Sequence, residues 1–540
     1  PPPSTTLELV GTILMKQKKI YETARGEYGR FSSIFDADSM ERIFQLSPLS
    51  KKRLIRKLMI KILMGREDRS RGGEPIFHWV TAGDSAAAGH GNSFTYSYTS
   101  ILEDTVGDLF KSAGINFVVT NHAGDAWSGM ELALCMEHIF GQDADVLSWD
   151  FRQMDSSTDS YGDPLSPSQG LDPLLFGERA GLVLPHLPFL FFLSLFPGGE
   201  ERIQKLETSG IGISSMGGEV LRELILTLPD YNNDQGRHAA LAVNKFRCGG
   251  IIEGKEMCHD KAGPFWCNPI GGADCDERTK NIVRNAKYHA GDSCSNGRYQ
   301  TPWNDGWKMH RLKGRLLGFH LIQMLHLAAI DLDIFERLHP ELQINQLLDA
   351  LREEEEVEEF LFSKTRPSRI INEGNTLFES WNILKQKNAI CLNAKVASRE
   401  QTKNLLKLEF EPPRESLCDD FLPFQNVYFR VPKEDGWKSI DPVAIWHGMI
   451  PKKASVSLGL CFKHCYGNQC GELSDELRIN WREVVIRVNG NLVSVKKVGG
   501  CYILEGKEGV VWSNEGLGSG MKIQNLGDGE LLLSSAFVLY

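Results

Sequence analysis

The chain has 540 residues, which is enough for two to four domains and a large core. A hydrophobic content of 41% and a charged content of 24% are typical of a soluble globular protein. A net charge of -10, with no basic patch interleaved with aromatic residues, argues against a nucleic-acid partner.

Residues 1–75 are predicted to be an N-terminal linker and a helical lead-in. The opening PPPSTT is typical of a stalk, so we expect a processed chain whose anchor or targeting signal lay upstream. Helical spacing follows over 32–68, broken by a turn at Ser47. The basic run 51–61 favours a helix with one solvated face over one resting on a membrane. No segment is both long and apolar enough to span a bilayer, so membrane association would come only through a missing N-terminal segment.

Strand and helix patterns alternate over residues 76–335. This alternation predicts an α/β domain with a parallel sheet that is covered on both faces. Right-handed crossovers would place the turns that follow the strands along one edge, where a site is expected. The predicted strands are 77–80, 115–120, 145–151 and 188–196. One predicted helix ends near residue 114, and the others span 129–140, 200–207 and 312–332. In the last of these helices, His320 and His326 are expected to be packed or surface histidines.

Residues 230–303 interrupt this alternation and form a Cys-rich insertion. The chain has 12 cysteines, and neither of its two crowded groups contains a CxxC pair, which favours disulfides over zinc. Disulfides predict an oxidising compartment, either the secretory pathway or the extracellular space. Because no N-glycosylation acceptor is present, a lumenal organelle compartment is the alternative. We expect no metal and no cofactor.

The rest of the chain divides into a connector and a β-rich part. Residues 336–400 are predicted to be a helical connector, with an amphipathic helix whose acidic run 353–356 lies on a solvated face. Period-two patterns over 401–540 predict an all-β sandwich domain, with Asn489-Gly490 as a hairpin turn. Modules of this kind bind glycans or pack on a catalytic neighbour.

A serine follows the first strand of the α/β domain. In Gly83-Asp84-Ser85, the turn would present the Ser85 hydroxyl at the carboxyl edge of the sheet, facing helix N–H groups. Acyl hydrolysis also needs a base, a group that orients it, and oxyanion donors. The N–H groups of Ser85 and of Gly124, in the turn after the second strand, are candidate donors. The alternative is that Gly and Ser simply belong to a turn.

Three turns in this order resemble the SGNH (GDSL-type) hydrolase superfamily: 83–85, the Gly-containing 121–126 and the Asp-ended 150–155. More narrowly, 77–100, 148–155 and 303–314 are similar to SGNH-like secretory or membrane-anchored proteins of diatoms and related algae. The resemblance covers about 76–330. It implies a flavodoxin-like three-layer α/β/α domain and an esterase, a lipase, or a carbohydrate O-acyl hydrolase or transferase.

The chain departs from the superfamily's pattern in two blocks. Where the third block carries Gly-x-Asn-Asp, this chain has RQMD, and Met154 cannot donate a hydrogen bond to an oxyanion. Where the algal group carries a histidine, this chain has Asn304, which cannot act as a general base at neutral pH. His310 is then the nearest substitute base, and Asp305 is a group that could orient it. The remaining candidates for the oxyanion site or the cleft are Gly124, Asp155, Asp84 and Asn304.

Two hypotheses follow. In the first, the catalytic site is degenerate and the chain is a binding or structural module for a glycan or a protein. Losing one oxyanion donor costs roughly 10²–10³ in rate, and losing a triad member leaves only a residual rate enhancement. In the second, Ser85 makes the chain an active serine esterase or a carbohydrate O-acyl hydrolase or transferase, with a base such as His310. A metal site built by His90, His122 and Asp155 is a third reading that the spacing does not demand.

Overall fold

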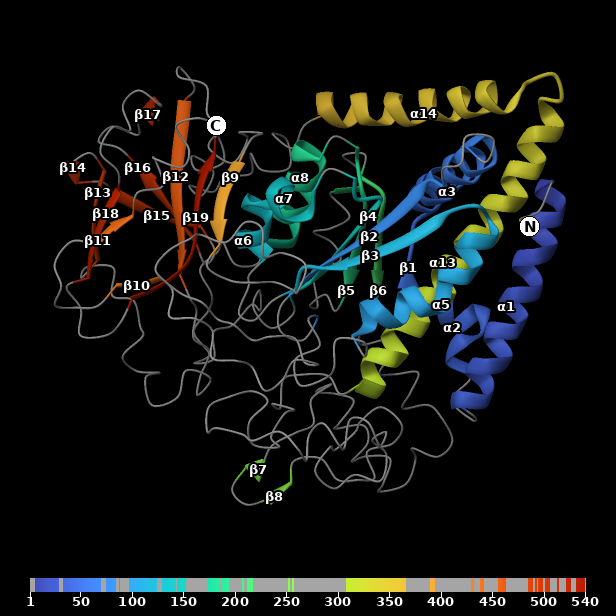
Figure 1. Cartoon of the computed structure of the whole chain (residues 1–540), viewed down its shortest axis with the longest axis horizontal. Helices are drawn as coiled ribbons and strands as arrows, with labels where there is room; N and C mark the ends of the chain where they lie inside the picture. The colour runs from blue at the N-terminus through green and yellow to red at the C-terminus, as the bar shows by residue number, and fades with distance from the viewer. Residues whose placement is uncertain are drawn as a thin grey trace.

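The computed structural model contains an α/β part, drawn at the centre and right of Figure 1, and a set of C-terminal strands at its left. In the α/β part the described residues are 5–28, 33–68, 74–83, 87, 97–123, 129–141, 143–151, 172–184, 186–193, 206–207, 211–216 and 307–365. Of the Cys-rich insertion, β7 (Ile251–Ile252) and β8 (Lys255–Glu256) are described. Beyond residue 365, only the backbone of the strands named below is described, so the predicted disulfides lie outside what can be tested.

A six-stranded sheet organises the α/β part. Its strands, in spatial order, are β1 (Phe44–Gln45), β6 (Ile213–Met216), β5 (Phe189–Leu193), β4 (Val146–Asp150), β2 (Ile76–Gly83) and β3 (Asn116–Asn121). All neighbours are parallel except β1, which pairs antiparallel with β6. Counted from β2, the parallel strands follow the doubly wound order 2-1-3-4-5. The predicted parallel α/β domain is therefore confirmed, while β6 and the lead-in strand β1 were not predicted.

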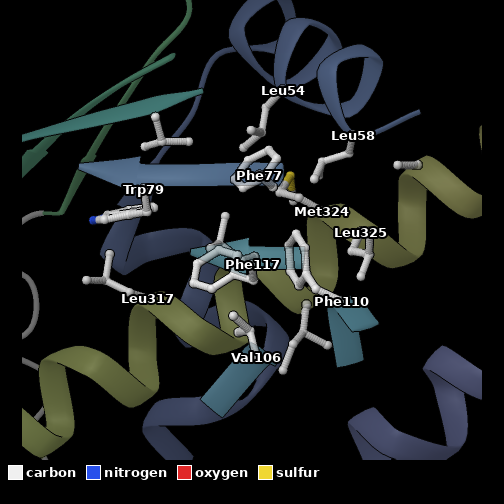
Figure 2. Packing of buried hydrophobic residues seen from close by; sticks show 14 of the residues in the cluster. Leu54, Leu58, Phe77, Trp79, Val106, Phe110, Phe117, Leu317, Met324 and Leu325 are labelled. Carbon is white, nitrogen blue, oxygen red and sulfur yellow. The ribbon is translucent and has the colours of Figure 1, made fainter. Parts of the chain in front are cut away.

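One face of the sheet is covered by α3 (Pro48–Asp68), α5 (Tyr98–Ser112) and α13 (Trp307–Leu338), and α1 (Thr6–Tyr28) packs outside them against α13 and α5. The short α2 (Ala37–Ile43) leads into β1. Because side chains alternate along a strand, Phe77 and Trp79 both enter this core, where Phe77 lies 5.4 Å from Phe110 between ring centroids (Figure 2). The core also buries Leu54 and Leu58 of α3, which gives the predicted amphipathic helix its buried side.

Two glycines let α13 lie directly against α5. A Cβ on Gly314 would lie 2.7 Å from the Ile101 side chain, and one on Gly318 would lie 2.5 Å from the Thr105 side chain. By length and composition, α13 could cross a membrane, with a mean hydropathy of 1.3 over its most apolar window. In this structure it packs against α1, α3 and α5, and 61% of that window is buried.

The opposite face of the sheet carries α6 (Gly129–Leu134), α7 (Met136–Phe140) and α8 (Asp172–Val183), as Figure 1 shows. Trp149 of β4 lies 5.9 Å from Phe192 on this face, and Phe151 lies 6.1 Å from Phe176 of α8, measured between ring centroids. Helices therefore cover both faces, as predicted.

The two charged runs of the sequence meet. α14 (Ile344–Thr365) lies along α3, and its acidic run pairs with the basic run of that helix (Figure 1). Lys57 Nζ lies 3.1 Å from Glu355 Oε1, and Arg56 Nε lies 3.4 Å from Glu354 Oε2. The acidic run is largely solvated, as expected, but it also holds α14 against α3.

The C-terminal strands form two sheets. The larger follows the order β10-β19-β12-β16-β15, with β17 pairing with β12 and β9 pairing with β19; the smaller follows β11-β18-β13-β14. Val488 pairs with Asn491 across a two-residue connection, which confirms the hairpin predicted at Asn489-Gly490. The packing of the two sheets as a sandwich stays a prediction. The bounds are β9 (Ala389–Asn393), β10 (Phe429–Val431), β11 (Lys438–Ile440), β12 (Ser455–Phe462), β13 (Val484–Val488), β14 (Asn491–Leu492), β15 (Ser494–Val498), β16 (Cys501–Glu505), β17 (Trp512–Ser513), β18 (Met521–Asn525) and β19 (Leu531–Leu539).

Candidate functional site

The candidate site is the carboxyl edge of the parallel sheet, where β2, β3 and β4 end beside the first turns of α5 and α13. Among the predicted site residues, His310 is described. The others lie outside the described residues: Ser85, Asp84, Gly124, Asp155, Asn304 and Asp305. The same holds for His90, so the predicted metal site is not tested, although no group of three His, Cys, Asp or Glu side chains within the described ranges could hold a metal ion.

Gly83, the last residue of β2, makes a close approach that only glycine permits. A Cβ at this position would lie 2.3 Å from the Ala87 Cβ and 2.7 Å from the carbonyl oxygen of Asp150. Real Cβ atoms do not come this near to backbone atoms, so any side chain here would push β2 away from β4. The glycine of the GDS sequence is therefore required by packing, whatever the serine two residues later does.

Asn121, at the end of β3, connects two turns at this edge. Its Nδ2 donates a hydrogen bond to the carbonyl oxygen of Ala87 at 3.3 Å, and its Oδ1 accepts one from the Ala123 N–H at 3.0 Å. Its side chain is buried. The sequence analysis assigned a role to Gly124 in this turn and none to Asn121. Asn121 could have been identified because it is an Asn at the end of a strand, where its side chain can hydrogen-bond to the backbone two residues later.

His310 lies in the first turn of α13 and is completely buried. Its Nδ1 accepts a hydrogen bond from the backbone N–H of Tyr98 at 3.2 Å. This N–H belongs to the first turn of α5 and has no partner within that helix. The two rings also stack, with 5.9 Å between centroids and 11° between planes. His310 therefore fixes the start of α5 against the start of α13.

This hydrogen bond determines the tautomer of His310. An Nδ1 that accepts from an amide carries no proton, so the neutral ring holds its proton on Nε2. A triad histidine needs the opposite arrangement, in which Nδ1–H donates to a carboxylate and Nε2 receives the proton of the serine. In the arrangement seen here, Nε2 is a donor and not a base. The assignment of His310 as the base stays a prediction.

A buried ion pair lies next to His310. Lys313 Nζ is 3.9 Å from Asp150 Oδ2, and the two side chains are 5% and 4% exposed. The same ammonium group lies 5.8 Å from the centroid of the Tyr98 ring, within range of a cation–π interaction. Sequence reasoning missed Lys313. Lys313 could have been identified as a charged residue one helical turn after His310, close to Leu312 and Leu316, which are fully buried in the same helix.

Two threonines extend this polar group toward the middle of the sheet. The hydroxyls of Thr81 and Thr99 lie 2.8 Å apart, and Trp79 Nε1 donates to Thr81 Oγ1 at 3.2 Å. We call the six residues Thr81, Tyr98, Thr99, Asp150, His310 and Lys313 the carboxyl-edge cluster. It holds a cation and a carboxylate that are almost fully buried and that join the end of β4 to α13.

Two further histidines, His122 and His320, pack against aromatic rings. His122, which follows β3, is 7% exposed, and its ring centroid lies 5.5 Å from that of Phe140. His320 stacks on Phe44 at 4.4 Å between centroids and meets Phe191 edge-on at 5.6 Å. Burial, together with the charge of Lys51, lowers the pKa of His320 to about 3. The expectation that His320 is a packed histidine is confirmed.

No family model and no curated protein matches the chain. Among solved structures, the chain is similar to a two-domain esterase (CEX) active on acetylated mannans, with 9% identity, a TM-score of 0.33, and 88% of this chain and 95% of that one covered. A second structure of the esterase, co-crystallized with mannopentaose, has 11% identity, a TM-score of 0.32, and coverage of 88% and 94%. At these values neither the fold nor the activity transfers, and the function has to be argued from the residues of this chain.

Proposed function

We propose that the chain is an SGNH-hydrolase-like protein with a degenerate catalytic site, which acts as a binding or structural module for a glycan or a protein. The observation that carries this proposal is the hydrogen bond from the Tyr98 N–H to His310 Nδ1. It engages His310, the predicted substitute base, in holding the start of α5, with the proton on the wrong nitrogen for a base.

The rest of the carboxyl edge supports the same conclusion. The charge of Lys313 lies against Asp150 and is buried, so removing either partner would leave an uncompensated charge at the edge of the sheet. The sequence adds Met154 and Asn304 at the positions where the superfamily carries an oxyanion donor and a base. A site that lacks both parts has neither the base to move a proton nor the donor to stabilise an oxyanion.

One observation favours the alternative, an active serine ester hydrolase or O-acyltransferase that uses Ser85. Gly83 still brings the end of β2 within van der Waals distance of β4, which is the backbone requirement of a tight turn that presents a nucleophile. Under this alternative, another residue would act as the base, or His310 would change its tautomer during the reaction.

Labelling with a fluorophosphonate probe separates the two. We expect no labelling of the folded wild-type chain at high probe concentration, and the same result for Ser85→Ala. Labelling of the wild type that disappears in Ser85→Ala would overturn the proposal. His310→Gln then identifies the base, with His339→Gln as its control, because His339 is an exposed histidine 42% accessible at its side chain.

Binding is tested in parallel on the same folded chain. A panel of oligosaccharides, with manno-oligosaccharides and their acetylated forms among them, is titrated by calorimetry against the wild type and a cleft variant, Asp155→Asn. We expect a saturable interaction that this variant weakens. If no glycan binds and no protein is enriched by cross-linking in the native source, a binding role is wrong.

A further inference from the structure

We infer that the first half of α1 docks on the surface of a lipid bilayer that contains anionic lipids, with its exposed apolar side chains inserted just below the headgroups. Figure 1 shows α1 at the right-hand margin of the α/β part, where it packs against α13 and α5. The inference is independent of the proposed function, because no residue of α1 belongs to the carboxyl-edge cluster.

The first half of α1 carries apolar residues on its outer side as well as on its inner side. Leu9 and Ile13 face the core and are 3% and 0% exposed. Leu7, Leu14 and Met15 are instead 62%, 54% and 69% exposed. A surface helix of a globular protein normally keeps polar residues on its outer side. Apolar residues gathered there indicate a surface that contacts another apolar phase or a partner.

The two hydroxyls in this half of α1 are already hydrogen-bonded. Thr12 Oγ1 donates to the carbonyl oxygen of Glu8 at 2.9 Å, and Thr6 Oγ1 donates to Glu336 at 2.6 Å. Each hydroxyl can therefore lie near the acyl chains without the cost of an unsatisfied donor. A Cβ on Gly11 would meet nothing within 4 Å, so the protein leaves this side of the helix open.

The end of α13 adds apolar residues at the same end of the molecule. The two helices run antiparallel, because Glu336 bonds to the start of α1 while Phe319 lies 6.3 Å from Tyr21, between ring centroids. Ile334 and Leu338, one helical turn apart, are 50% and 69% exposed. Of the eight large apolar side chains that are exposed in the described part of the chain, five therefore belong to these two helices.

The charges of α1 favour an anionic bilayer. Lys18 and Lys19 are exposed one turn after the apolar residues, and Glu22 and Arg25 follow on the exposed side. Helices that lie in a membrane interface combine an apolar surface with lysines whose ammonium groups reach the headgroups. The field of an anionic surface attracts each lysine that comes close to it.

The size of the apolar surface argues against a second copy of this chain as the occupant. A stable protein interface buries about 800 Å² on each partner, from about 20–30 residues a side. The exposed apolar side chains of α1 and the end of α13 number five. A bilayer needs no matching surface, so a few inserted side chains together with lysines are enough for reversible binding.

The test is vesicle flotation with the full 540-residue chain, using phosphatidylcholine alone or mixed with phosphatidylglycerol. We expect the chain to float with the mixed vesicles and much less with phosphatidylcholine. Leu14→Glu should lower the partition coefficient about tenfold or more, because one inserted leucine is lost. Val357→Glu is the matched control: Val357 is 57% exposed on α14, and the change adds the same charge but should leave partitioning unchanged.

A second variant keeps the test decisive if Leu14→Glu disturbs the packing of α1. Replacing Lys18 and Lys19 together by Gln should lower binding to the mixed vesicles by about fivefold per lysine and leave binding to phosphatidylcholine unchanged. A chain that floats with neither vesicle, or equal losses in Leu14→Glu and Val357→Glu, would show the inference to be wrong. Sedimentation velocity tests the other occupant: a dimer that Leu14→Glu dissociates would assign this surface to a second copy instead.

Discussion

The two edges of the parallel sheet hold their charges in opposite ways. At the carboxyl edge, Asp150 and Lys313 are 4% and 5% exposed. At the amino edge, Arg56 is also only 5% exposed, but its partner Glu354 is 53% exposed, and exposure is 11% for Lys57, 29% for Glu355 and 66% for Lys52. Removing one member of a buried pair leaves a desolvated charge, whereas water replaces the lost partner of an exposed one. Similar ion pairs are therefore a structural requirement at one edge and adjustable at the other.

The largest expected effect comes from breaking the buried pair. Lys313→Met takes this cation away from Asp150 and should lower the free energy of unfolding by about 3–5 kcal/mol, measured by urea denaturation. Lys52→Met, which removes an exposed lysine on α3, should cost about 1 kcal/mol or less. Equal costs for the two variants would mean that the edges do not differ.

Protonation of His320 comes next and tests a buried group between the two edges. The pKa of His320 is about 3 in the folded chain, against 6.5 for an unperturbed histidine, so the unfolded chain binds the proton more tightly. Its contribution to stability is complete above pH 6.5 and is lost as the pH falls toward 3. At pH 5 we expect a loss of about 2 kcal/mol relative to neutral pH.

His320→Phe should flatten this part of the stability–pH profile, because Phe can pack on Phe44 and Phe191 without binding a proton. The exposed His339, changed to Gln, is the control and should leave the slope as it is in wild type. A profile with the same slope in His320→Phe as in wild type would contradict the assignment.

A backbone change sharpens the comparison without touching a charge. Gly83→Ala forces a Cβ against Ala87 and the Asp150 carbonyl and should destabilise the chain by about 1–3 kcal/mol. Gly107→Ala is the matched control: nothing lies within 4 Å of its added Cβ, and it sits inside α5. Since Ala is the better helix former, it should stabilise by about 0.5–1 kcal/mol. Thermal unfolding of the two variants should therefore move in opposite directions.

The smallest effect is expected from the ion pairs between α3 and α14. Salt screens partly exposed charges. Raising the salt concentration from low values to ~1 M should therefore weaken the docking of α14 on α3 by about 1 kcal/mol or less. Hydrogen exchange of the first half of α14 measures this. The pKa of the Glu355 carboxyl is lowered by Lys57 from its usual value of 4.5. The Lys57–Glu355 ion pair therefore contributes its full stability above pH 4.5, and this contribution is lost as the pH falls below that value. Protection that salt does not change would assign α14 docking to its apolar residues instead.

The sequence allowed the four strands β2, β3, β4 and β5 to be predicted, because short apolar runs followed by turns depend on local patterns alone, whereas the short strand β6 was missed. β1 could not be predicted, since two residues next to a helix become a strand only through β6. The Asn489-Gly490 hairpin was predictable because the turn chemistry fixes the register.

The features that could not be predicted depend on contacts between residues that are far apart in the sequence. The runs 51–61 and 353–356 were each predicted to face solvent, and nothing in either run specifies the other as its partner. In the candidate site, His310 was identified as a residue of interest, but its role depends on which nitrogen faces the Tyr98 N–H, and that follows from how two helices cross. Lys313 was missed for the same reason, because its partner Asp150 lies on a strand more than a hundred residues earlier.

The contact between α1 and the end of α13 has a consequence for how the chain is made. Thr6 Oγ1 donates a hydrogen bond to Glu336 Oε2 at 2.6 Å, and Arg66 joins them. These partners are separated by 330 positions in the sequence. At ~5–20 residues per second, a ribosome needs about 15–65 s to make that interval. For all that time the apolar side of α1 has emerged while the helix that buries it does not yet exist. The N-terminal part of this domain therefore exposes apolar surface during synthesis, and its core closes only after α13 has been translated.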